Sequence, residues 1–365
     1  MSYDYTIIGA GLFGSVVAHE LGKAGKNVLV VERKEHIGGT VYTENILGVN
    51  VHKYGAHIFR TDDKEIWDYI NQFAEFNNFI NTPKAYYKGH LYSLPFNMNT
   101  FRELWDIVTP AEAEAIINEQ RIANINPENL EEYVLDAVGT DIYLKLIKGY
   151  TEKQWGKPCD ELPPDLMKRI PIRYTYNNNY YDKRYQGIPI GGYTQIIEKM
   201  LEQATVFTGT DASELKIHDN QRIIYTGCID EFFGYEFGEL EYRSLEFQTY
   251  IDNKADTQGV AVINFTDEEV PYTRRIEHKY FENVDTDRVI QTYEFPHDVD
   301  EFHEKYYPVP TEENLKLYQE YLEYAKKEYP NIIFCGRLGE YKYYDMEDTI
   351  KKALLTCRNI LKDVV

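Results

Sequence analysis

The sequence contains few cysteines and no long apolar run. None of its four cysteines has the CxxC spacing of a metal or redox site: Cys159, Cys228, Cys335 and Cys357. No apolar segment approaches the roughly 20 residues that a membrane-spanning helix needs. The N-terminus lacks the basic start and the small-residue cleavage site of a signal peptide. We therefore expect buried, reduced thiols, no metal, no membrane span and a cytoplasmic location.

Positive charge is also scarce. The chain has 39 lysines and arginines against 60 aspartates and glutamates, which gives a formal net charge of −21. Such an acidic surface repels nucleic acid and anionic membranes, so neither is an expected partner. An anionic small molecule stays possible where arginines gather locally. Tyrosine, by contrast, is abundant at 33 residues, and its phenol can both stack on and hydrogen-bond to a polar aromatic ligand.

The N-terminal segment reads as a strand, a glycine-rich turn, a helix and a second strand. Residues 4–8 and 27–32 are the strands, and Gly9, Gly11 and Gly14 form a GxGxxG turn between the first strand and the helix. Such a turn brings backbone N–H groups close to a pyrophosphate at the helix N-terminus. Glu32 ends the second strand, where a carboxylate can accept from a ribose hydroxyl. The combination predicts a bound dinucleotide.

Two later features favour FAD over NAD as that dinucleotide. Gly38 and Gly39 follow the second strand closely and would extend the phosphate cradle, although a plain surface turn is the alternative. A late apolar strand at residues 332–335 runs into Gly336 and Arg337, which suits the ribityl and pyrophosphate part of a flavin cofactor.

The rest of the chain alternates between helical and strand patterns. Residues 100–169 read as helices, with a start signal at Thr109 followed by proline. Residues 84–94 and four segments between 245 and 295 read as strands of an antiparallel sheet. Residues 312–329 and 346–361 are the closing helices.

Three groups of residues outside the dinucleotide motif are of types that could bind a nucleotide. Tyr150 and Trp155 lie on one short segment and could stack on a base. Arg169 and Arg173 flank a proline, and Arg274 precedes a second arginine; guanidinium groups suit bidentate contacts to a pyrophosphate. Taken singly, each aromatic could equally fill the core and each arginine could be a solvated charge.

Taken together and in order, these segments resemble the bacterial UDP-galactopyranose mutase family along nearly the whole chain. The segments that carry the resemblance are Tyr54-Gly-Ala-His-Ile-Phe, Gly149-Tyr-Thr-Glu-Lys-Gln-Trp-Gly, Lys168-Arg-Ile-Pro-Ile-Arg, Asn177-Asn-Asn-Tyr-Tyr, Asn264-Phe-Thr-Asp, Tyr272-Thr-Arg, Tyr306-Tyr-Pro, Gly336-Arg-Leu-Gly and Tyr343-Tyr-Asp-Met.

The resemblance implies an α/β chain, α+β overall, of three domains. A discontinuous, Rossmann-type FAD-binding domain would comprise residues 1–80, 190–235 and 312–365. A helical domain, residues 100–180, would carry a mobile substrate loop with Arg169. An antiparallel β-sheet domain would comprise residues 81–99 and 240–311.

The resemblance also implies roles for single residues. Tyr150 and Trp155 would hold the uracil, and Arg169 and Arg274 would clamp the two phosphates. The implied catalytic residues are Arg169, Arg274 and His57. The implied substrate-binding residues are Asn81, Tyr150, Thr151, Trp155, Arg169, Tyr180, Asn264, Arg274, Tyr307 and Tyr343. The implied cofactor-binding residues are Gly9, Gly11, Phe13, Gly14, Glu32, Arg33, Gly38, Gly39, Thr40, His57, Ile58, Arg337, Asp345 and Met346.

The sequence departs from the family pattern at one position. Where the family has His-Ile-Phe-His, this chain has Arg60 after His57-Ile-Phe, so a second histidine role cannot be carried over. Arg275 beside Arg274 is also unusual, and we assign the phosphate clamp to Arg274 from its spacing to Glu277 and His278.

The activity that the resemblance implies is an isomerisation without net redox change. UDP-galactopyranose and UDP-galactofuranose, a precursor of cell-surface polysaccharide, would interconvert through a covalent bond between N5 of reduced FAD and C1 of the sugar. An external reductant such as NAD(P)H and a homodimer are further expectations. Two alternatives stay open: another FAD-dependent oxidoreductase, or a non-catalytic flavoprotein that binds UDP-sugars.

Overall fold

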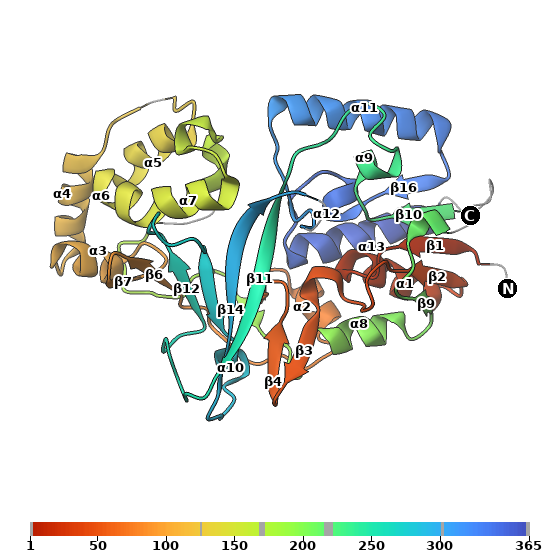
Figure 1. The fold of residues 1–365 in the computed structure, drawn as a ribbon, viewed down its shortest axis with the longest axis horizontal. Helices are drawn as coiled ribbons and strands as arrows, with labels where there is room; N and C mark the ends of the chain where they lie inside the picture. Colours follow the sequence, from red (N-terminus) through yellow and green to blue (C-terminus); the bar gives the residue numbers. More distant parts are fainter. Residues whose placement is uncertain (1–2, 125, 168–171, 215–221, 301–302, 363–365) are drawn as a thin grey trace. The chain divides into compact units, whose positions relative to one another are not determined.

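The computed structural model describes residues 3–124, 126–167, 172–214, 222–300 and 303–362 (Figure 1). Its contacts divide the chain into two compact units. Unit 1 consists of Met1–Asn78, Lys183–Ser244 and Val299–Val365, and unit 2 consists of Phe79–Asp182 and Leu245–Asp298. The division into three domains stays a prediction, since the helices at 100–180 and the antiparallel strands share unit 2 in this structure.

A five-stranded parallel sheet lies at the centre of unit 1. Its spatial order is β9-β2-β1-β10-β16. In chain order this is 3-2-1-4-5, the Rossmann arrangement that the sequence predicted. The strands are β1 (Tyr5–Ile8), β2 (Val28–Val31), β9 (Thr205–Phe207), β10 (Arg222–Tyr225) and β16 (Ile332–Phe334). The direction of winding reverses at β1, so the sheet has its topological switch point between β1 and β10.

Helices pack on this sheet through apolar faces. Helix α1 (Leu12–Lys23) contacts α8 (Thr194–Leu201) and α13 (Met346–Lys362). Helix α13 buries Ile350, Ala353, Cys357 and Ile360, whose spacing of three and four residues places them on one helix face. The other elements of unit 1 are η1 (Gly39–Val41), β3 (Thr43–Ile46), β4 (Val49–His52), β5 (Phe59–Thr61), α2 (Lys64–Ile70), β8 (Tyr185–Gly187), η5 (Ala212–Glu214), α9 (Ile229–Phe232), β15 (Tyr307–Pro308), α11 (Glu312–Glu328) and α12 (Gly336–Gly339).

The larger, mixed sheet has the order β15-β11-β14-β13-β12-β6-β7, and all of it except β15 and the first three residues of β11 belongs to unit 2. The pairs β14–β13, β13–β12 and β6–β7 are antiparallel, as predicted, whereas β12 and β6 run parallel. The strands are β6 (Lys84–Tyr87), β7 (His90–Ser93), β11 (Tyr242–Asp252), β12 (Val262–Phe265), β13 (Arg274–Glu277) and β14 (Val289–Asp298). The strand predicted over residues 275–281 ends earlier, because Lys279–Glu282 form a helical turn, α10.

The helices of unit 2 enclose a second apolar core. They are α3 (Met98–Trp105), α4 (Pro110–Gln120), α5 (Leu130–Val138), α6 (Thr140–Ile142), a π-helical turn η2 (Tyr143–Ile147), α7 (Lys148–Trp155), η3 (Cys159–Glu161) and η4 (Pro164–Met167). The predicted start at Thr109 is confirmed. The Thr109 hydroxyl accepts from the Glu112 N–H, and the Glu112 carboxylate accepts from the Thr109 N–H.

The sequence predicts reduced cysteines and no membrane-spanning helix. All four cysteines are buried and free of disulfides, as expected for reduced thiols. Within the described ranges, no helix combines the length and the apolar character that crossing a bilayer would require.

Candidate functional site

The turn between β1 and α1 in unit 1 depends on glycines, because a side chain at these positions would collide with nearby backbone atoms. A Cβ atom on Gly14 would lie 2.0 Å from the carbonyl oxygen of Gly9, so only glycine lets α1 start this close to β1. A Cβ on Gly39 would lie 3.0 Å from the Cα of Gly11. The Gly38 N–H donates to the Ala10 carbonyl over 2.8 Å. The two predicted glycine groups therefore form one continuous backbone cradle.

Glu32 ties this cradle to the end of β2. Its carboxylate is buried and accepts from the N–H of Ala10 over 2.8 Å and from the N–H of Lys34 over 3.0 Å. An ionised carboxylate has about four acceptor sites, so these two bonds leave capacity for a ribose hydroxyl. Glu32 thus combines a structural task with the predicted binding task.

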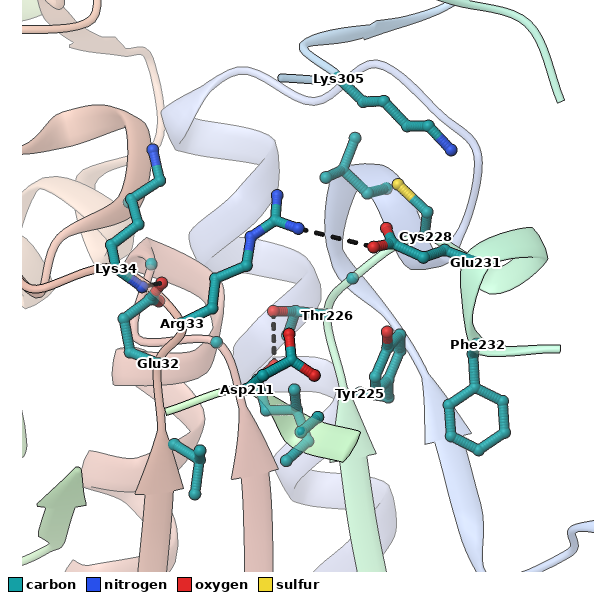
Figure 2. A pocket seen from close by; sticks show the side chains of 18 of the residues that line it. Glu32, Arg33, Lys34, Asp211, Tyr225, Thr226, Cys228, Glu231, Phe232 and Lys305 are labelled. Carbon is teal, nitrogen blue, oxygen red and sulfur yellow. Dashed lines mark hydrogen bonds and ion pairs between the residues drawn. The ribbon is translucent and has the colours of Figure 1, made fainter. Parts of the chain in front are cut away.

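A cavity of about 620 Å³ opens where β1, β2 and β10 end (Figure 2). This is the switch point of the sheet, where open α/β sheets bind nucleotides. Six predicted cofactor residues line it: Gly9, Gly11, Glu32, Arg33, Gly39 and Thr40. Gly14 and Gly38 shape the turn beside it, and Phe13 is buried in the apolar core. The cavity suits the adenosine and diphosphate half of a dinucleotide.

The sequence did not predict the side of the cavity that β10 and the residues near its end form. The Thr226 hydroxyl donates to the Ile8 carbonyl over 2.8 Å, which closes the sheet beside the cavity. Figure 2 shows Arg33 paired with Glu231, at 3.6 Å, across the opening. Residues of this wall are Asp211, Tyr225, Thr226, Cys228, Glu231, Phe232 and Lys305. The available signal was the polar Thr226 directly after a buried strand.

The segment after β4 positions His57 and its neighbours. The His57 ring lies 2.9 Å, Nδ1 to oxygen, from the Gly55 carbonyl, and Ile58 is buried. Arg60, at the position that departs from the family pattern, forms an ion pair of 3.3 Å with Asp345. Asp345 also accepts from the N–H of Asp348 over 3.0 Å and so caps α13, which starts at Met346.

Arg337 and Tyr343, six residues apart in the chain, meet Tyr307 of β15 in unit 1. The guanidinium of Arg337 lies 4.9 Å from the ring centre of Tyr343 and 5.8 Å from that of Tyr307. The two rings stack at 6.0 Å. The Arg337 side chain also donates to the Tyr344 carbonyl over 2.7 Å, which fixes the guanidinium on the rings.

In unit 2 a row of side chains crosses the sheet. Arg274 on β13 is the direct register partner of Asn264 on β12 and of Glu294 on β14. Direct partners point to the same face of a sheet, so the three side chains lie side by side. Arg274 and Glu294 form an ion pair of 2.9 Å, and Glu294 is buried. The row holds a guanidinium in a fixed orientation.

Tyr150 on α7 faces this row. Burial raises the pKa of the Tyr150 phenol, while the positive charge of Arg274 acts in the opposite direction. On the same helix Thr151 is buried, and Trp155 packs on the apolar core of unit 2. The structure thus brings Tyr150, Arg274 and Glu294 together from a helix and two strands.

The two neighbouring arginines of β13 point to opposite faces, as successive strand residues do. The Nε atom of Arg275 donates to Gln258 over 2.8 Å, and its guanidinium lies over the Phe265 ring. Arg274, on the other face, forms the ion pair with Glu294, and its charge acts on Tyr150. The assignment of the phosphate clamp to Arg274 rather than Arg275 stays a prediction.

The remaining predicted residues of unit 2 are partly described. The Tyr180 N–H donates to the carbonyl of the buried Asn81 over 2.9 Å, which links these two. Arg173 is held by its N–H to the Phe96 carbonyl and by its side chain to the Asn179 carbonyl. Arg169 lies outside the described residues, so its role and the closing of its loop stay predictions.

Comparison with known proteins identifies two families along the chain. The family model of UDP-galactopyranose mutase matches residues 145–343, which is more than half of the chain. That of the NAD(P)-binding Rossmann-like domain matches residues 7–73. The second match covers the glycine cradle and Glu32, and the first covers Tyr150, Arg274 and Arg337.

Similar proteins match over the full length. A Klebsiella pneumoniae protein named as a probable UDP-galactopyranose mutase is 38% identical and covers 98% of this chain and 94% of its own. The Escherichia coli dTDP-fucopyranose mutase is 36% identical over 98% of both chains. The solved structure of a reduced UDP-galactopyranose mutase has the same fold, with a TM-score of 0.77, 16% identity and coverage of 99% and 94%. With its glycine cradle, its arginine row and these matches, the chain belongs to the UDP-galactopyranose mutase family.

Proposed function

We propose that this protein binds FAD and, with the flavin reduced, interconverts UDP-galactopyranose and UDP-galactofuranose. Family membership supports the reaction class. The observation that carries the proposal is the row in unit 2, where Arg274 lies between Asn264 and Glu294 and is ion-paired with Glu294. A guanidinium held in place by a buried carboxylate is preorganised to receive a diphosphate, because no reorientation is needed when charge develops.

FAD is the cofactor that we propose for unit 1. The close approach of Gly14 to Gly9, the buried carboxylate of Glu32 and the cavity at the switch point fit its adenosine and diphosphate. Arg337, His57 and the N-terminus of α13 at Met346 are proposed to hold its flavin half. Bound and reduced, the cofactor would supply a nucleophilic nitrogen for the anomeric carbon without net redox change.

The protein's own residues would bind, orient and stabilise charge. Tyr150 and Trp155 are proposed to hold the nucleobase, and Arg274 with Arg169 the two phosphates. When UDP leaves the sugar, negative charge develops on the diphosphate, and the guanidinium groups would stabilise it. Asn264, beside Arg274 in the row, is proposed to donate to the substrate. An external reductant such as NAD(P)H is proposed as well, and a homodimer stays a prediction.

The test is turnover of UDP-galactopyranose by purified protein with and without dithionite. Chromatography should show a second UDP-sugar, UDP-galactofuranose, only with the reduced protein. Oxidised sugar products or consumption of oxygen would favour the FAD-dependent oxidoreductase instead. Binding of UDP-galactose with no product under reduction would favour the non-catalytic flavoprotein.

A second candidate substrate has its own support. The Escherichia coli relative, 36% identical over the full length, is named for dTDP-fucopyranose. The same assay with dTDP-fucopyranose, at equal concentration, compares the two sugar nucleotides by kcat/KM. A higher value for the dTDP-sugar would replace the substrate proposed here but leave the reaction class unchanged.

A further inference from the structure

Lys153, on α7, sits in a cage of backbone carbonyl groups. Its ammonium donates to the carbonyls of Phe265, Asp267 and Val270, each at 2.8 Å, and of Tyr272 at 3.2 Å. All four carbonyls belong to the end of β12 and to the connection from β12 to β13. We name this connection, residues 266–273, the β12–β13 turn. The side chain of Lys153 is thus hydrogen-bonded to carbonyl groups along the whole turn.

Two further contacts join α7 and the preceding π-helical turn to the β12–β13 turn. A Cβ on Gly149 would lie 2.3 Å from the Thr266 carbonyl oxygen, so the helix and the turn touch backbone to backbone. The Thr266 hydroxyl donates to the Lys145 carbonyl, in η2, over 2.7 Å. Gly149 and Lys153 are four residues apart and therefore share one face of α7, the face toward the turn.

The two sides of this junction carry the two groups of the proposed phosphate site. Tyr150 follows Gly149 on the helix, and Arg274 comes two residues after Tyr272, the last carbonyl that Lys153 holds. The charge of Arg274 acts on the pKa of the Tyr150 phenol, so the two side chains lie close to each other. Any sliding of the turn along α7 would change the distance between them.

We infer that Lys153 is a positioning residue that locks the β12–β13 turn to α7 and thereby holds Arg274 against Tyr150 for binding of the nucleotide diphosphate. The inference rests on the proposed function, because it assigns Lys153 to that same site. The three N–H bonds of an ammonium diverge from one nitrogen, which suits carbonyl oxygens arranged around it, and with four carbonyls in reach one N–H is shared between two of them. A planar guanidinium cannot point its donors in this way, so arginine is not an equivalent residue.

A purely structural lysine would lower stability without a specific effect on the nucleotide. The test therefore compares Lys153→Met, which keeps much of the volume and removes the charge, with Lys148→Met on the same helix. Lys148 lies 6.0 Å from the Tyr143 ring centre and provides the matched control. Lys153→Arg, which keeps the charge, is the third variant. It replaces Lys153→Met in the comparison if Lys153→Met does not fold.

Three measurements are made on each variant: the FAD content, the Kd of UDP by calorimetry, and amide hydrogen exchange of residues 265–274. We expect Lys153→Met and Lys153→Arg to bind UDP at least about tenfold more weakly, with faster exchange in the turn and unchanged FAD content. Lys148→Met should match the wild type in all three.

The inference is overturned if the Lys153 variants keep the wild-type Kd, or if they lose UDP affinity only in proportion to a loss of FAD and stability. Failure of the proposed function looks different. In that case the wild-type protein itself does not bind UDP, while exchange in the β12–β13 turn still shows whether Lys153 holds it.

Discussion

The proposed cofactor site of unit 1 and the proposed substrate site of unit 2 are built in different ways. In unit 1, backbone groups do most of the shaping, and the key residues are those that lack a side chain, such as Gly14. In unit 2, long side chains from a helix and two strands meet, as Tyr150, Arg274 and Glu294 do. The first site leaves no room for an added side-chain atom at its glycines, whereas the second depends on side-chain atoms that a substitution can remove. Substitutions of opposite kind should therefore break the two sites.

The largest effect is expected from adding one methyl group in unit 1. Gly14→Ala places a carbon 2.0 Å from the Gly9 oxygen, which forces α1 off β1. We expect loss of bound FAD and, with it, of all activity, measured by flavin absorbance and turnover. Gly22→Ala in the same helix is the control, since its Cβ meets only the flexible Gln203 side chain at 3.1 Å. FAD-replete Gly14→Ala protein would contradict the cradle.

The next effect is expected from removing atoms in unit 2. Arg274→Ala should lower kcat by about 10²–10³, or roughly 3–4 kcal/mol, since a preorganised donor to the leaving diphosphate is lost. FAD should stay bound. Arg275→Ala, one residue away but on the opposite sheet face, should stay within about threefold of the wild type. If Arg275→Ala were the more damaging variant, the assignment of the two faces would be wrong.

A smaller loss of FAD binding is expected when a side chain is removed from the site in unit 1. Glu32 is the side chain to test, because the rest of that site is formed mostly by backbone groups. Glu32→Ala should weaken FAD binding by about 1–3 kcal/mol, through the lost ribose bond and the unpaired N–H groups of Ala10 and Lys34. Reconstitution of apoprotein with FAD, followed by fluorescence, gives the Kd. An unchanged Kd would show that Glu32 only braces the turn.

The smallest effect concerns pH. Burial lowers the pKa of Lys153 to about 8, and Asp267 on the turn acts in the opposite direction. Other carboxylates nearby in the chain are Glu152 on α7, which accepts from the Cys159 N–H, and Glu268 and Glu269 on the turn. Above this pKa the neutral amine has two donors in place of three and holds the turn less well.

The sign of this effect follows from linkage. If the charged form of Lys153 favours UDP binding, affinity is full below about pH 8 and falls by at most about tenfold per pH unit above it. Burial raises the pKa of the Tyr150 phenol above its ordinary value and so moves it away from this window. Calorimetry from pH 7 to 9.5 measures the change. Lys153→Met should bind weakly but with a flat profile, and an equal slope in both proteins would point to another group.

The sequence by itself determined the Rossmann unit and its cradle. Gly9, Gly11, Gly14 and Glu32 lie within 24 residues of one another, and their spacing encodes a local turn whose geometry has few alternatives. The helix start at Thr109 was equally local, since a capping box involves residues three apart. The order of the five strands, in contrast, comes from the structure.

Tertiary structure alone decided which distant residues meet. Arg337 lies on the rings of Tyr307 and Tyr343. Thr226 bonds to Ile8, 218 positions away in the chain, because β1 and β10 are neighbours in the sheet. The sequence contained Lys153 inside a motif but could not show its partners. Backbone carbonyls are identical at every residue, so no pattern of side chains reveals which of them a folded turn will gather around one ammonium.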